Sequence, residues 1–221
     1  MSDKILTTPS LYDYLNGYYI GVNKTFKHNL ISALCSARFI IISNEVRNQY
    51  VSTNLRRMML HEAMYSNENV NFICVGGHYA GSETIRQMHE MLYRNGIGTV
   101  NGSKHFLELG NMTIQAVAPD SLERTMEGKP FLNNVYIHDD APRDVRNQLD
   151  IIRLATRHAG SRYVESHGFN WWREDREAPI KTKVFPGNRM IFVTQHGNDL
   201  LDYMRRGIPN EFHDEIAVVT G

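Results

Sequence analysis

The sequence has few cysteines, no long hydrophobic run and no excess of either charge. Cys35 and Cys74 are its two cysteines, so no disulfide framework is expected. No apolar run approaches the roughly 20 residues of a membrane span, and the N-terminal stretch MSDKILTTPS lacks the apolar centre of a signal peptide. Lysine plus arginine and aspartate plus glutamate both number 24, so a polyanion site would need local clustering. We therefore predict a soluble, cytoplasmic protein without a membrane partner.

Apolar runs alternate with segments of helical periodicity along the chain. Buried strands are predicted at residues 38–43, 70–75, 135–138, 189–194 and 216–219. Helices are predicted at residues 29–36, 53–65, 82–93, 145–158 and 199–206. A hairpin is expected where alternating residues 107–109 and 112–118 flank Gly110 and Asn111. This order predicts an α/β fold with a mostly parallel sheet flanked by helices.

The domain boundaries follow from the same patterns. Residues 1–28 are rich in turns and aromatics and are expected to form an N-terminal arm with a hairpin near residues 18–25. Residues 29–221 are expected to form one domain, in which residues 158–185 make a basic and aromatic loop.

The stretch FLNNVYIHDDAPRD (residues 131–144) carries the chemistry that is easiest to interpret. An apolar strand runs into Asp139 and Asp140, which places two carboxylates at the edge of the sheet where α/β proteins bind ligands. In nucleotide hydrolases, acids at this place hold Mg²⁺ and orient the attacking water. The alternative is that they cap the next helix.

Two longer stretches, LELGNMTIQAVAPDSLERTMEGKPFLNNVYIHDDA and MIFVTQHGND, extend this pattern. Together with the element order, they resemble the ATPase domain of the large terminase subunit, the DNA-packaging motor of tailed phages and herpesviruses. The resemblance runs from about residue 29 to residue 212 and implies a three-layer, RecA-like P-loop NTPase fold. It implies that Asp139 holds Mg²⁺, that Asp140 is the catalytic carboxylate and that Thr194 is the coupling residue. Asp140 is one methylene shorter than the glutamate usual in that role.

The loop that would bind phosphate departs from the family. Terminase loops read Arg-Gln-x-Gly-Lys-Ser/Thr-Thr, whereas residues 47–53 read RNQYVST. Arg47, Ser52 and Thr53 match the pattern, but Tyr50 replaces the glycine and Val51 replaces the lysine. No nucleotide cofactor is therefore expected. None of the ten histidines shows a zinc-ligand spacing, so no metal site is expected either. The nuclease domain of packaging motors is also not expected.

Basic residues and aromatic rings alternate in the predicted loop, as in sites for single-stranded nucleic acid. The candidate contacts are Arg157, Arg162, Trp171, Trp172, Arg173, Arg176, Lys181 and Lys183. Interspersed acids leave open a solvated loop that its tryptophans anchor to the core.

These features predict a catalytically inactive, terminase-like phage protein in the cytoplasm of an infected host cell. Its expected role is to bind nucleic acid, with single-stranded DNA favoured, or to act as a regulatory or scaffold factor for a phage or host protein. One alternative is a residual Mg-ATPase of a DNA-packaging complex, with Mg-ATP as cofactor. Another is a protein-interaction module in phage transcription or counter-defence.

Overall fold

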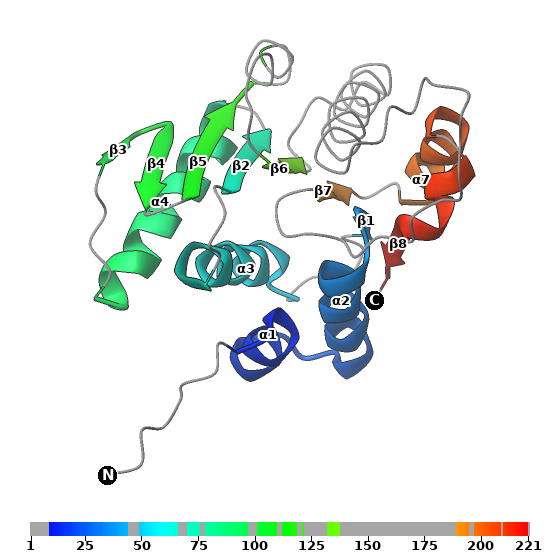
Figure 1. Ribbon diagram of the computed structural model, residues 1–221, viewed down its shortest axis with the longest axis horizontal. Coiled ribbons are helices and arrows are strands. Elements are labelled where there is room, and N and C mark those ends of the chain that lie inside the picture. Colours follow the sequence, from blue (N-terminus) through cyan, green and yellow to red (C-terminus); the bar gives the residue numbers. More distant parts are fainter. Residues whose placement is uncertain are drawn as a thin grey trace, which may run out of the picture.

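Eight strands form one sheet with helices against both faces (Figure 1). The computed structural model describes residues 9–43, 49–65, 70–75, 78–96, 101–109, 112–118, 121, 132–137, 189–194, 197–208 and 210–220. The helices are α1 (Leu11–Tyr18), α2 (Lys24–Ser36), α3 (Val51–Tyr65), α4 (His78–Arg94), α7 (Gly197–Gly207) and the 3-10 helix η2 (Asn210–Glu215). The strands are β1 (Phe39–Ser43), β2 (Val70–Val75), β3 (Asn101–Ser103), β4 (Phe106–Leu109), β5 (Met112–Val117), β6 (Leu132–Ile137), β7 (Met190–Thr194) and β8 (Ile216–Val219).

The strand order in the sheet is β3-β4-β5-β2-β6-β7-β1-β8. Every neighbouring pair from β5 to β8 is parallel, whereas β4 runs antiparallel to both β3 and β5. Strand β7, which is late in the sequence, lies between β1 and β6. The α/β class and the mostly parallel sheet predicted from the sequence are therefore confirmed.

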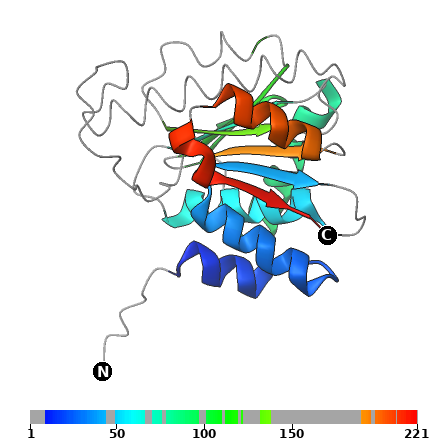
Figure 2. The same ribbon diagram turned by 90° about the vertical axis from the view of Figure 1, so that its right-hand side faces the viewer.

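The two faces of the sheet carry separate apolar cores. Ile40 and Ile42 of β1 belong to the core that includes α1, α2, α3 and α4. Phe39 and Ile41 belong to the core that includes α7. Figure 2 shows α1, α2 and α3 below the sheet and α7 above it. Because β1 is covered on both faces, its sequence is a continuous apolar run instead of an alternating one.

The connection between α1 and α2 is not the hairpin expected at residues 18–25. Asn23 caps α2, since its Oδ1 accepts hydrogen bonds from the backbone N–H groups of Thr25 (2.9 Å) and Phe26 (3.1 Å). Helix α2 therefore begins earlier than predicted. An asparagine cap satisfies N–H groups that have no partner within the helix, and this local bond favours a helix start over a hairpin turn.

Part of the expected N-terminal arm packs into the core. Leu15 of α1 and Phe26 of α2 are both almost completely buried, and α2 runs across the boundary predicted between residues 28 and 29. Helix α1 lies against α2 and α3 in both views (Figures 1 and 2).

Several local predictions hold. The hairpin prediction is confirmed, because β4 and β5 are antiparallel and Leu109 pairs with Met112. Strands β1, β2, β7 and β8 lie where the sequence predicts them, and β6 starts at Leu132, earlier than expected. Strand β3 was not predicted. The helix predicted at residues 145–158 and the loop at 158–185 lie outside the described residues.

Two buried arginines support the strands that enter the centre of the sheet. Arg189 precedes β7 and pairs with Glu62 of α3, and each side chain is only 2% exposed. Arg38 precedes β1 and pairs with Glu215, with Nε and Oε2 2.8 Å apart. Burial raises the pKa of Glu215, and the Arg38 charge lowers it by a smaller amount. The Arg189–Glu62 pair joins α3 to the sheet in an environment where an unpaired charge is costly.

The helices are moderate in length, and α4 has 17 residues. Among the residues that the structure describes, no helix is both long enough and apolar enough to cross a membrane.

Candidate functional site

The carboxyl ends of β1, β6 and β7 lie together at one edge of the sheet. Ser43 at the end of β1 is opposite Thr194 at the end of β7. Ile137 at the end of β6 is opposite Phe192, near the end of β7. The strands are parallel, so the segments that follow them leave the sheet on the same side, where ligands of α/β proteins bind. We call this region, defined by Ser43, Ile137 and Thr194, the carboxyl edge.

Two hydroxyl side chains are buried at the carboxyl edge. Ser43 is 3% exposed and Thr194 is 7% exposed. Within the described residues, Ser43 Oγ has no hydrogen-bond partner. Helix α7 begins close by, and a Cβ added to Gly197 would lie 3.4 Å from Ser43 Cβ. Burying a hydroxyl without a hydrogen-bond partner costs about 1–3 kcal/mol of stability. Ser43 is therefore a candidate for contact with a ligand.

Tyr50 and Val51 stand where the resembling loops carry glycine and lysine. Tyr50 has φ +50°, in the left-handed region that glycine adopts without cost. For other residues that region costs about 1–2 kcal/mol. The Tyr50 side chain is 53% exposed, whereas Val51 is 7% exposed and belongs to the larger core. The backbone at residue 50 is thus in a conformation that suits glycine, and the next side chain points into the apolar interior.

Asn54 holds this turn in place. Its Oδ1 accepts from the Ile20 N–H at 3.2 Å, and its Nδ2 donates to the Ile20 carbonyl at 2.9 Å. The same Nδ2 lies 3.2 Å from the Tyr50 carbonyl and 3.3 Å from that of Gln49. Gln49 Oε1 accepts from the Asn23 N–H at 3.3 Å. The connection between α1 and α2 is therefore fastened to the turn before α3, which offsets the cost of the left-handed Tyr50.

The structure places some of the predicted site residues and not others. Thr194, for which the coupling role stays a prediction, lies at the carboxyl edge. Ser52 and Thr53 lie in the first turn of α3 and are partly exposed. The remaining candidates lie outside the described residues: Arg47, Asp139, Asp140, Arg157, Arg162, Trp171, Trp172, Arg173, Arg176, Lys181 and Lys183.

Ser43, Asn54 and Gly197 were not identified from the sequence. Ser43 had a usable signal, because it is the polar residue that ends a run of four apolar ones. Asn54 had none, because its backbone partner Ile20 is 34 residues away. Gly197 follows β7 closely, but only the structure places it against Ser43.

Metal-ligand groups and cysteine thiols can be examined in the part of the chain that the structure describes. There, no group of three or more histidine, cysteine, aspartate or glutamate residues is arranged to hold a metal ion. Burial raises the pKa of Cys74 to about 12, and burial also raises that of Cys35. Since the thiolate is the reactive form, both thiols are poor nucleophiles.

Comparison of the sequence with models of known protein families finds no matching family, and comparison with curated proteins finds no match.

Proposed function

We propose that this chain is a terminase-like P-loop NTPase scaffold that has lost nucleotide hydrolysis and acts by binding nucleic acid. The observation that carries the proposal is the turn before α3. The backbone at Tyr50 is in the left-handed region, which glycine adopts without strain. Val51, at the position of the lysine, packs in the core.

The sheet order supports the scaffold part of the proposal. Strand β1 precedes the loop at residues 47–53, and β6 precedes the two aspartates. Strand β7 lies between β6 and β1 in the sheet and ends in Thr194. The three positions that the resemblance makes functional therefore follow strands that end at the same edge. In the sheet, β2 lies on one side of β1 and β8 lies on its other side. The chain connections therefore run in opposite directions from this edge, which makes it a topological switch point, where open α/β sheets bind ligands.

The side chains at the loop support the loss of hydrolysis. A phosphate loop needs a cation against several phosphate charges, and such a charge-assisted contact is worth about 1.5–3 kcal/mol. Val51 supplies no charge and is buried. A tyrosine at residue 50 also puts a bulky ring where the family keeps the backbone bare for the phosphates.

The nucleic-acid part rests on the composition of residues 157–183, where cations and aromatic rings alternate. Arg189, just beyond this stretch, is not available to a ligand because it is buried against Glu62. The binding surface is therefore proposed for the residues before it.

A residual Mg-ATPase is the second candidate, and the Ser43 hydroxyl favours it. Ser43 Oγ is buried at the carboxyl edge without a partner among the described residues. A bound phosphate or hydrated Mg²⁺ would give it one.

The test of the nucleic-acid proposal is the affinity of the full chain for a fluorescent single-stranded oligonucleotide, measured by anisotropy. For about five phosphate contacts, raising the salt from about 50 to about 200 mM should weaken binding about a hundredfold. Replacing both Trp171 and Arg173 with alanine should weaken it by a further tenfold or so.

The matched control is Lys24→Ala, which removes one exposed cation from α2. This variant should bind as the unaltered chain does. No binding at low salt, or equal losses in the control and the double variant, would exclude the proposed surface.

A further inference from the structure

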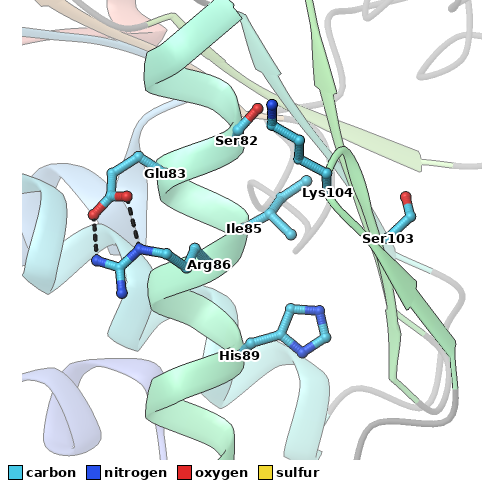
Figure 3. Close-up of a pocket in the computed structure, with 7 residues that line it drawn as sticks. All are labelled: Ser82, Glu83, Ile85, Arg86, His89, Ser103 and Lys104. Carbon is cyan, nitrogen blue, oxygen red and sulfur yellow. Dashed lines mark hydrogen bonds and ion pairs between the residues drawn. The ribbon is translucent and has the colours of Figure 1, made fainter.

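A cavity of about 650 Å³ lies between α4 and the β3–β4 hairpin, away from the carboxyl edge (Figure 3). Ser82, Ile85 and His89 line it from α4, and Ser103 and Lys104 line it from the hairpin. Strand β3 is at one end of the sheet, whereas β1 and β8 are at the other. The cavity is therefore separate from the carboxyl edge. Its volume is in the range of sites for small organic ligands.

The polar groups of this cavity are divided between its two ends. In Figure 3 the Lys104 ammonium lies beside the Ser82 hydroxyl at one end, and Ile85 lies between them and His89. Ser82 Oγ is also 3.1 Å from Nδ1 of His105, the residue after Lys104 in the hairpin turn.

The His89 ring lies close to the hairpin because Gly102 has no side chain. A Cβ at that position would lie 2.5 Å from His89 Cε1, closer than real contacts allow. With glycine there, the ring has room beside the hairpin and lines the second end of the cavity. Ile85, which is 1% exposed, belongs to the core beneath.

The carboxylate of Glu83, which lines this cavity, already has a cationic partner. Glu83 pairs with Arg86, and Gln87 donates to the same carboxylate. Hydrogen bonds from Arg86 and then Gln87 lower the pKa of Glu83 to about 2. Arg86 also pairs with Glu90 at 3.5 Å. Lys104 has no ion-pair partner among the described residues, so its charge is available to an anion.

We propose that this cavity binds the phosphate group of a phosphorylated ligand. The Lys104 ammonium offers a charge-assisted hydrogen bond to the phosphate oxygens, and the Ser82 hydroxyl lies beside it at the same end of the cavity (Figure 3). The His89 ring offers a surface for the part of the ligand next to the phosphate, such as a ribose or base. The phosphate comes from a free nucleotide or from a nucleic-acid strand, and the experiment separates these two sources.

The experiment is a titration of the full chain with adenosine monophosphate and with a single-stranded oligonucleotide, followed by NMR of the histidine rings. We expect both the His89 and the His105 ring signals to shift with at least one ligand. Lys104→Ala should weaken that binding about tenfold or more. Lys24→Ala, which removes the same charge from an exposed helix position, should leave it unchanged.

The pattern of shifts identifies the ligand and tests the site. A response to the mononucleotide supports a free phosphorylated ligand, and a response to the oligonucleotide alone supports a strand phosphate. Asp139→Ala and the Trp171/Arg173 double variant should leave the response to the mononucleotide unchanged, which separates this site from the proposed function. No shift with either ligand, or an equal loss in Lys24→Ala and Lys104→Ala, would overturn the proposal.

Discussion

Replacing Glu62 with alanine is expected to lower the free energy of unfolding by about 3–5 kcal/mol. Glu62 and Arg189 are each 2% exposed, so the change leaves the guanidinium of Arg189 without its carboxylate in the interior. Desolvation of a charge is repaid only when its partner and hydrogen bonds are present. Chemical denaturation of the full chain, followed by circular dichroism, measures the loss.

Two variants make this result specific. Glu90→Ala removes an exposed carboxylate that pairs with Arg94 on α4, and it should cost less than about 1 kcal/mol. The double change of Glu62→Leu with Arg189→Met removes both buried charges and should recover most of the lost stability. A loss below about 1 kcal/mol for Glu62→Ala would mean that the two side chains are not paired in the interior.

Replacing Val51 with lysine is expected to destabilise the chain by about 3 kcal/mol or more without creating nucleotide binding. In a working phosphate loop, a lysine at this position faces the phosphates. Here residue 51 is 7% exposed and packs with the larger core, so its ammonium would meet apolar groups. Thermal unfolding with and without Mg-ATP measures both effects at once.

The matched control is Val51→Met, whose apolar side chain has a length close to that of lysine. Its added volume should cost about 1–3 kcal/mol, less than the charge of Val51→Lys. If Val51→Lys is instead as stable as the unaltered chain, and Mg-ATP raises its melting temperature, then residue 51 still faces a phosphate site. That outcome would reverse the interpretation of the loop.

The fold class was predictable because parallel strands that are covered on both faces need continuous apolar runs. The apolar runs at β1, β2 and β7 fit this pattern, and the hairpin at β4 and β5 has its glycine turn in the sequence. The start of α2 was missed because Asn23 follows a tyrosine-rich segment that also suits a hairpin. The cap bond at Asn23 became visible only with the coordinates.

The candidate site was less predictable, because its geometry depends on residues far apart in sequence. The substitution at Tyr50 was evident from the sequence, but its left-handed backbone depends on Asn54 and on the α1–α2 connection. Likewise, the partner of Arg189 could not be predicted, because Glu62 lies 127 residues earlier. Local composition carries no information on such pairings. The roles of Asp139 and Asp140 stay predictions.

The measurement that tests the central claim most directly is calorimetric titration of the full chain with Mg-ATP. The proposal that the scaffold has lost its nucleotide predicts no saturable heat of binding up to about 1 mM ligand, corresponding to less than about 4 kcal/mol of binding free energy. Saturable binding in the micromolar range that Asp139→Ala abolishes would contradict it, and the carboxyl edge would then be a working nucleotide site.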